Sequence, residues 1–185
     1  MSNHQSLETA FNTMFEAESD AIFRFCLFRV SDREQALDLV QDTFARAWRA
    51  MQDGTVMDNA RAFLFTVAHR LVIDWYRKKK PVSLEAQGEQ DGTDEIIEPA
   101  DPLTQGAGLE LAAEGRFLIS KLGELDHSYR QAVYLRYVEG LSPPEIGKIL
   151  GMSEGAASVR INRGIKQLRE IAGYGAEIGQ DQGHE

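Results

Sequence analysis

The sequence predicts an all-α fold with two small helical domains joined by a flexible acidic linker, the second domain containing a helix-turn-helix. Three observations lead to this. Apolar residues recur at spacings of three and four over most of the chain, which is the helical period. Residues 81–108 lack that period and are rich in proline and acidic side chains. Residues 141–170 hold two helical segments, each with its own start signal, separated by a glycine.

The composition is that of a globular protein without a membrane span. The chain has 185 residues, 43% hydrophobic and 26% charged, enough for one ordinary domain or two small ones. No apolar run reaches the roughly 18 residues of a transmembrane helix, and we expect no signal peptide. Cys26 is the single cysteine, which excludes an internal disulfide and a cysteine-based zinc site. We expect no metal and no cofactor.

The net charge of −9 is concentrated outside the two predicted domains. Residues 81–112 contain eight Asp and Glu and no Lys or Arg, and residues 173–185 contain three acidic residues and no cation. Residues 1–80 are neutral, and residues 113–172 carry nine cations against seven acids. The acidity therefore lies in a connector and in a tail that we expect to be disordered, and it does not argue against nucleic-acid binding.

Three helices are expected in the first domain, which spans residues 1–80. The first covers 6–30. Ser31, with Glu34 three residues later, predicts a capping box for the second helix, which runs to about Met51 with Leu37 on its apolar stripe. A polar loop follows, and the third helix runs from Asn59 to four consecutive cations before Pro81.

The second domain is expected over 109–172. Helicity resumes near Leu109, and Asp126 is predicted to cap a helix that ends at Gly140. We expect Tyr137 and Val138, near the end of that helix, to be largely buried.

The helix-turn-helix is the most informative stretch of the chain. Ser142 and Glu145 form a second capping-box pattern, with Pro143 at the first helical position. Gly151 can adopt the left-handed conformation that ends this helix, and Ser153 can cap the next.

The second helix of this motif is expected over 154–170. One of its faces is apolar: Ala157, Ile161, Ile165 and Leu168. The opposite face is small, polar and cationic, as a helix that enters a DNA major groove requires. A helical hairpin with a solvated basic face would share this pattern.

Three blocks resemble the extracytoplasmic-function (group IV) sigma factors of bacterial RNA polymerase. DREQALDLVQDTFARAWR is similar to the family's polymerase-docking helix, and ARAFLFTVAHRLVIDWYRKKK to its minus-ten promoter helix. The third block, from Leu125 to Glu170, is similar to the minus-thirty-five-binding domain. The order of the blocks and the linker between them make the resemblance specific. It implies an alternative sigma factor that binds core polymerase, recognises promoter DNA and initiates transcription, with no catalytic site.

The resemblance assigns residues to each role. The expected minus-thirty-five contacts are Ala156, Ser158, Val159, Arg160, Asn162, Arg163 and Lys166. The expected minus-ten contacts, including the loop that captures a flipped base, are Gln52, Asn59, Arg61, Phe63, His69, Arg70, Arg77, Lys78, Lys79 and Lys80. The expected polymerase contacts are Asp38, Gln41, Asp42, Arg46 and Arg49.

The chain departs from the family pattern at several positions. Ser158 stands where the family usually has lysine, and Phe63 where it usually has tryptophan. Gly164 replaces a usual alanine, which lowers intrinsic helix stability by about 0.5–1 kcal/mol. These changes leave the promoter sequence open.

Three other classes of protein fit the sequence less well. A sigma-like adaptor that sequesters an anti-sigma factor without binding DNA would have lost its DNA-contacting cations, and here they remain. A helix-turn-helix repressor would not explain the first two blocks. An enzyme is disfavoured because the four histidines are scattered. The expected partners are core RNA polymerase and promoter DNA in the cytoplasm, with an anti-sigma factor left open and no membrane insertion.

Overall fold

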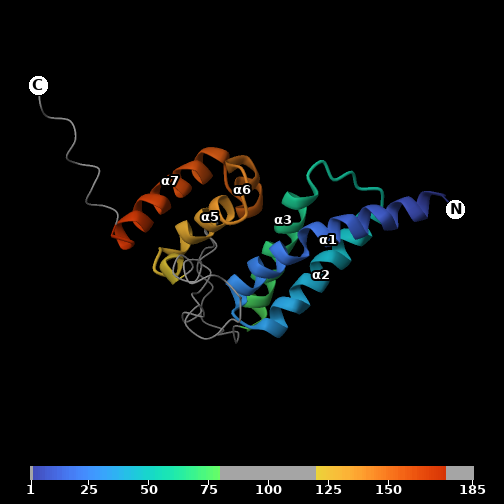
Figure 1. Cartoon of the computed structure of the whole chain (residues 1–185), viewed down its shortest axis with the longest axis horizontal. Helices are drawn as coiled ribbons and strands as arrows, with labels where there is room; N and C mark the ends of the chain where they lie inside the picture. The colour runs from blue at the N-terminus through green and yellow to red at the C-terminus, as the bar shows by residue number, and fades with distance from the viewer. Residues whose placement is uncertain (1, 80–119, 174–185) are drawn as a thin grey trace, which may run out of the picture. The chain divides into compact units, whose positions relative to one another are not determined.

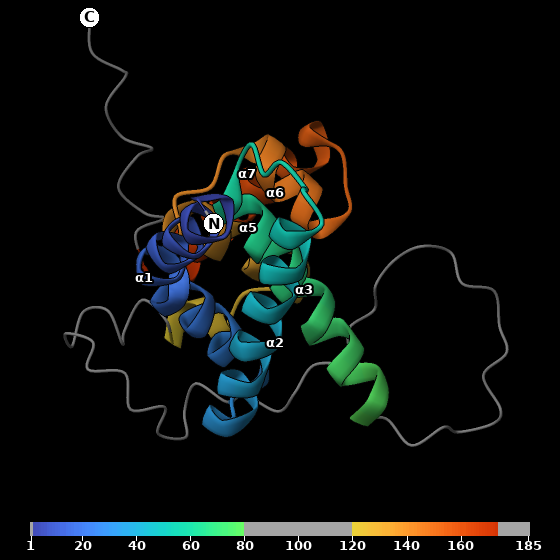
Figure 2. The same cartoon turned by 90° about the vertical axis from the view of Figure 1, so that its right-hand side faces the viewer.

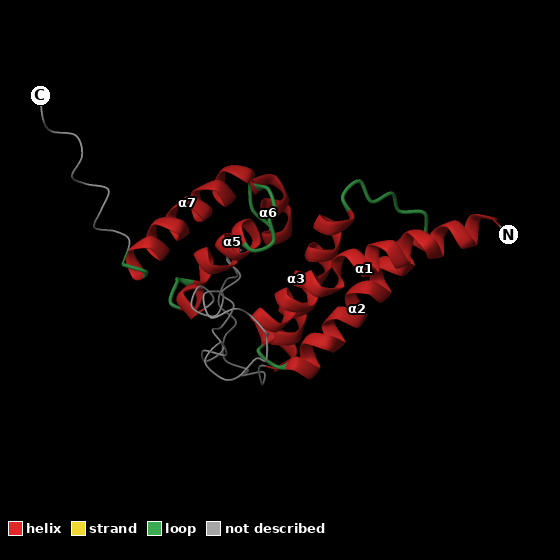
Figure 3. Ribbon diagram, in the orientation of Figure 1, coloured by secondary structure: helices red, strands yellow, loops and turns green. Residues whose placement is uncertain are grey.

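The computed structural model describes residues 2–79 and 120–173, and within these ranges the side chains of residues 2–4 and 127 are left aside. The chain divides into two compact units, Met1–Pro102 and Leu103–Glu185. The described residues form helices and loops and contain no strand (Figure 3). The all-α, two-domain prediction is therefore confirmed. The expected linker, the onset of helicity near residue 109, and the tail beyond residue 173 lie outside the described residues.

Three helices form the described part of the first unit: α1 (Ser2–Val30), α2 (Arg33–Gln52) and α3 (Ala60–Lys79). Each helix packs against the other two (Figures 1 and 2). At the centre, four side chains are fully buried: Ile22 and Phe25 on α1, and Leu64 and Phe65 on α3. The Phe25 and Phe65 rings meet edge to face with centroids 5.3 Å apart, a favoured aromatic geometry.

Beyond this core, an aromatic cluster of partly exposed rings joins α1 and α2, and only Phe44 of the cluster is buried. Phe11 lies edge to face against Trp48, with centroids 5.0 Å apart. Phe15 lies in the same way against Phe44, at 4.7 Å. The cluster holds the first half of α1 against α2.

The start of α2 differs from the prediction by one residue. Asp32, not Ser31, is the N-cap, and its carboxylate accepts hydrogen bonds from the N–H groups of Glu34 and Gln35 at 2.9 and 3.1 Å. Ser31 has a φ of 61°, and its N–H donates to the Leu27 carbonyl at 2.9 Å. Ser31 therefore ends α1 in the left-handed conformation and cannot also cap α2, so the capping box predicted at Ser31 was wrong.

The described part of the second unit contains α5 (His127–Tyr137), α6 (Pro143–Leu150) and α7 (Glu154–Ile171), which pack on one another. The end signals predicted at Asp126, Ser142 and Gly151 are confirmed, whereas α5 ends at Tyr137, with Val138 as its C-cap, and not at the predicted Gly140. Asp126 accepts from the Ser128 N–H at 2.9 Å, and the Ser142 N–H donates to the Glu145 carboxylate at 2.6 Å. Gly151 ends α6 with a φ of 68°.

Two glycines allow close packing inside the helix-turn-helix unit. A Cβ on Gly147 would lie 2.8 Å from the Met152 carbonyl oxygen, at the turn between α6 and α7. A Cβ on Gly164 would lie 2.5 Å from Cγ2 of Val133 and 3.0 Å from Cβ of Tyr129, both on α5. At both positions, the absence of a side chain allows the neighbouring segment to pack closely.

Four apolar residues that the periodicity assigned to buried faces are exposed, and one of them is Phe15 on α1, at 43%. Leu37 on α2 is 41% exposed, Tyr137 at the end of α5 is 59% exposed, and Val138 just beyond it is 44% exposed. Leu39 takes the buried position on α2 that the pattern gave to Leu37. A leucine at either position continues a spacing of three or four, so the pattern alone could not choose between them.

Candidate nucleic-acid and protein interfaces

The outer side of α2 carries a mixed polar surface. The five predicted protein-contacting residues are all exposed: Asp38, Gln41, Asp42, Arg46 and Arg49. The opposite side of the helix is buried through Ala36, Val40 and Ala47. The exposed Leu37 adds an apolar side chain to the polar surface. A helix packed on one side and open on the other can bind a second protein without disturbing the core.

The loop between α2 and α3 is anchored at both ends (Figure 3). The Thr55 N–H donates back to the Ala50 carbonyl at 2.9 Å. Asn59 accepts from the Ala62 N–H at 2.8 Å and thereby caps α3. Between these anchors Val56 is 84% exposed, and Gln52 is exposed at the end of α2. The loop thus presents an amide and an apolar side chain to solvent, whereas the Asn59 carbonyl oxygen serves the helix.

Three of the predicted DNA-contacting residues on α3 are partly or fully buried against the unit. Arg61 forms an ion pair with Glu18 of α1, and its guanidinium lies 5.2 Å from the centroid of the Phe65 ring. Phe63 is half-buried, and His69 is only 5% exposed. The position of His69 does not support a direct DNA contact.

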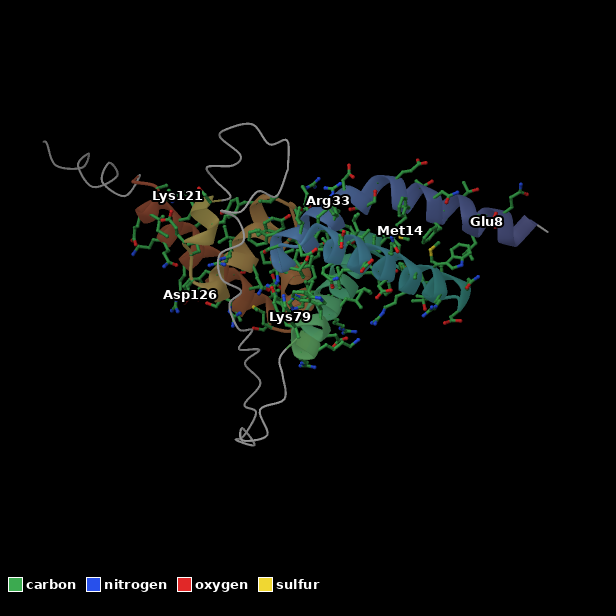
Figure 4. The ribbon with its side chains drawn as sticks, turned by 90° about the horizontal axis from the view of Figure 1, so that it is seen from below. Glu8, Met14, Arg33, Lys79, Lys121 and Asp126 are labelled. Carbon is green, nitrogen blue, oxygen red and sulfur yellow. The ribbon has the colours of Figure 1, made fainter. Side chains whose placement is uncertain are left out.

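The C-terminal end of α3 is a cationic surface. Arg70, Arg77, Lys78 and Lys79 are exposed, and Lys80 lies outside the described residues. Figure 4 labels Lys79 at this end of the helix, where its Nζ lies 4.7 Å from the centroid of the Trp75 ring. Exposed cations on one helix end can bind the phosphates of a nucleic-acid backbone.

Two hydrogen bonds that tie this end of α3 to the other helices were not predicted. The Trp75 indole N–H donates to the Gln35 amide oxygen on α2 at 2.7 Å. The neighbouring Tyr76 hydroxyl donates to the Arg29 carbonyl of α1. A buried or partly buried tryptophan usually has a hydrogen-bond partner for its indole N–H. The sequence could therefore predict that Trp75 has a partner, but it could not predict that the partner is Gln35.

On α7 the predicted division of faces is present. Ala157, Ile161 and Gly164 are buried. The outward side chains are Ala156, Val159, Asn162, Arg163 and Lys166, all exposed, with Ser158 and Arg160 half-buried at the edges. Ser153 caps the helix by accepting from the Ala156 N–H at 3.2 Å. The arrangement offers two apolar side chains, one amide and two cations on one helix face.

Neither a metal centre nor a membrane helix is found in residues 2–79 and 120–173. No group of three or more His, Cys, Asp and Glu side chains there could hold a metal ion. The helices of this described part are too short or too polar to cross a bilayer.

Comparison with known proteins gives a family match within each of the two units. Residues 14–82 match the family profile of sigma-70 region 2, and residues 118–168 match that of sigma-70, region 4. The RNA polymerase sigma factor CnrH of Cupriavidus metallidurans is 33% identical over 140 residues, which cover 72% of this chain and 71% of CnrH. The ECF RNA polymerase sigma factor SigL of Mycobacterium tuberculosis is 28% identical over 157 residues, covering 84% of this chain and 85% of SigL.

This chain belongs to the extracytoplasmic-function (ECF) sigma factors. It is an alternative sigma factor, a regulator of transcription initiation. Its α3 lies within the segment that matches region 2, and α7 lies in the region 4 segment except for its last three residues. Among solved structures, this ECF sigma factor resembles the sigma factor RpoE of Bartonella quintana in complex with the anti-sigma factor NepR, with a TM-score of 0.64 and 27% identity over 89% of this chain and 97% of that one. It also resembles CnrH in complex with the cytosolic domain of CnrY, with a TM-score of 0.60 and 25% identity over 90% of each chain.

Proposed function

We propose that this sigma factor divides its work among three surfaces. The outer side of α2 docks on core RNA polymerase. The loop after α2 and the cationic end of α3 bind the minus-ten promoter element, and the outward face of α7 binds the minus-thirty-five element. The observation that carries the proposal is the face of α7, where exposed Val159, Asn162, Arg163 and Lys166 stand opposite a buried apolar side.

The second helix of a helix-turn-helix reads base edges in the major groove. Arginine pairs best with guanine through two hydrogen bonds, and an apolar side chain can contact the thymine methyl group. Lysine acts more often as a point charge on phosphate. Arg163 and Val159 therefore suit base recognition, and Lys166 suits backbone contact.

The minus-ten surface combines phosphate and base contacts. The exposed cations Arg70, Arg77, Lys78 and Lys79 would bind backbone phosphates beside the melted bases. Gln52 and Val56 at the loop offer a hydrogen-bonding amide and an apolar wall to an extruded base. Arg61 supports this surface from within, through its ion pair with Glu18. We propose no direct contact for His69.

The docking role of α2 is tested by Asp42→Arg. Asp42 is exposed, so reversing its charge should leave the fold intact and weaken binding to core polymerase. Co-purification with core enzyme at moderate salt measures the binding, and circular dichroism checks the fold. The matched control is Asp74→Arg, which reverses an exposed acidic charge on α3. Equal co-purification of wild type and Asp42→Arg would contradict the assignment of α2.

An anti-sigma factor is a further proposed partner. RpoE was solved with the anti-sigma factor NepR, and a protein that covered α2 here would compete directly with polymerase. Asp42→Arg should then weaken both complexes. The sigma-like adaptor remains the alternative function, and it is favoured if substitutions on α7 leave promoter binding unchanged. We also propose that the chain catalyses no reaction of its own and acts in the cytoplasm, where bacterial polymerase transcribes.

A further inference from the structure

The cationic end of α3 is tied to α2 through a chain of side-chain contacts. Lys79 lies over the Trp75 ring, with Nζ 4.7 Å from the centroid. The Trp75 indole N–H donates to Gln35 Oε1 at 2.7 Å. Gln35 lies in the first turn of α2, where its own N–H donates to the capping carboxylate of Asp32 at 3.1 Å. The three side chains thus connect an exposed ammonium group to a capped helix end.

The indole cannot turn freely in this arrangement. The Tyr76 ring lies against the Trp75 ring at 71°, with centroids 4.8 Å apart, and the hydrogen bond to Gln35 holds the ring edge. Because the ring face is fixed, the region of negative potential above it is also fixed, and that region attracts the Lys79 ammonium. A lysine on a flexible stem loses side-chain entropy when it binds a phosphate. Holding the ammonium in place beforehand reduces that loss.

We propose that Gln35 is a positioning residue for promoter binding. Its side chain orients Trp75, and Trp75 holds Lys79 ready for a backbone phosphate of the minus-ten element. This inference rests on the proposed function of α3. It assigns Gln35 a role in DNA affinity although Gln35 belongs to the helix whose outer side is proposed to dock on polymerase.

The first test uses Gln35→Leu in the holoenzyme reconstituted with core polymerase. The substitution puts an apolar side chain, one atom shorter, in place of the amide and removes the acceptor for the indole N–H. Promoter affinity should fall about two- to fivefold, the scale of one exposed cation–π contact. The affinity for core polymerase should not change. An unchanged promoter affinity for Gln35→Leu, with a reduced affinity for Lys79→Ala, would overturn the inference and leave the proposed DNA surface intact.

Double variants separate positioning from general loosening of the unit. Trp75→Phe removes the donor of the same hydrogen bond. The double variant Gln35→Leu/Trp75→Phe should therefore bind the promoter as tightly as whichever single variant binds it less tightly. Gln35→Leu should also have no further effect in a Lys79→Ala background. In a Lys78→Ala background, by contrast, its full effect should remain, because the cation that lies over the Trp75 ring is Lys79 and not its exposed neighbour Lys78. Additive losses in all three backgrounds would overturn the inference.

The salt dependence of promoter binding distinguishes positioning from a purely structural role of Gln35, because a purely structural role would not change it. Lys79→Ala should lower the slope of log affinity against log salt by about one counterion, and Gln35→Leu should lower it in part. Thermal unfolding of each variant shows whether the unit remains folded. A fall in affinity for Gln35→Leu with an unchanged slope and a lowered melting temperature would mean a structural role only. No effect of Lys79→Ala on promoter affinity would overturn both this inference and the proposed phosphate contact of Lys79.

Discussion

At Gly164, helix α7 comes so close to α5 that a side chain has no room. Helix propensity favours alanine over glycine by about 0.5–1 kcal/mol in a helix interior, so from the sequence alone this glycine is a defect. In the structure the glycine is required by packing, because an added Cβ would lie 2.5 Å from Val133 Cγ2 and 3.0 Å from Tyr129 Cβ. The close approach sets the angle at which α7 presents its outward face.

Gly164→Ala should therefore lower the free energy of unfolding of the second unit by about 1–3 kcal/mol, the usual cost of overpacking. Urea unfolding followed by circular dichroism measures it. Gly155→Ala on the same helix is the control, since a Cβ there would meet nothing within 4 Å, and this variant should be neutral or stabilised. A Gly164→Ala protein as stable as the Gly155→Ala protein would show that α5 and α7 separate at little cost.

Cys26 is a buried thiol, and burial raises its pKa to about 12, against a smaller opposing effect of Arg29. The folded pKa lies above the ordinary value of 9.0. The unfolded chain therefore ionises first as the pH rises, and this group lowers the stability of the first unit progressively between about pH 9 and pH 12. Below that window the thiol contributes no pH dependence.

Cys26→Ala should remove this dependence. The variant will be less stable at neutral pH because it leaves a cavity, but its stability should fall less steeply than that of wild type above pH 9. Urea unfolding at several values of pH gives the comparison. Parallel stability curves for the two proteins over that range would contradict the raised pKa. Alkylation of the folded wild type at pH 8 should be slow for the same reason.

In helix α7, one face carries two cations of different chemistry, to which we assign two kinds of proposed DNA contact. Arg163 and Lys166 are both exposed, three residues apart, and neighbours at that spacing lie on the same side of a helix. Their chemistry differs, because the guanidinium fork matches guanine whereas the ammonium group is a point charge. One helix face can therefore supply specificity and affinity through separate residues.

Alanine substitutions should separate these two contributions. Arg163→Ala should cost about 1–3 kcal/mol on the preferred upstream element and relax base preference at one position. Lys166→Ala should weaken all sequences alike and reduce the salt slope by about one counterion. Holoenzyme footprinting across upstream variants at two salt concentrations measures both. If neither substitution changes promoter affinity or base preference, α7 does not read DNA. The function of a sigma-like adaptor would then fit the chain better than that of a sigma factor.

Helix ends show how far local sequence carries a structural prediction. Asp126, Ser142 and Gly151 act as predicted, because caps depend on residues within one turn of each other. At the start of α2 the sequence holds two capping residues side by side, Ser31 and Asp32. The choice between them depends on how α1 ends, and the left-handed Ser31 assigns the cap to Asp32.

For the whole molecule, each unit carries its own core and its own proposed partners. Both tryptophans, Trp48 and Trp75, lie in the first unit. Tryptophan emission therefore reports the folding of that unit alone, and circular dichroism reports the helices of both. This difference allows the two units to be followed separately in the intact chain.

We propose boundaries near 1–80 and 109–172, and we expect each fragment to fold alone with the melting behaviour it shows in the full chain. In the full chain, Gly164→Ala should shift the transition seen by circular dichroism and leave the tryptophan transition in place. Coupled shifts in both signals, or a 1–80 fragment without a cooperative transition, would show that the units depend on each other for stability.

The sequence by itself determined the helices, their main end signals, the two-domain order and the face of α7 that carries Arg163 and Lys166, since all of these follow from residues close together in the chain. The tertiary structure decided which side chains those faces leave free. Arg61 is paired with Glu18 across 43 residues, His69 is buried, and the partner of Trp75 lies 40 residues away at Gln35. Helical period tells which residues share a side of one helix. Only the packing of α1, α2 and α3 determines what each side meets.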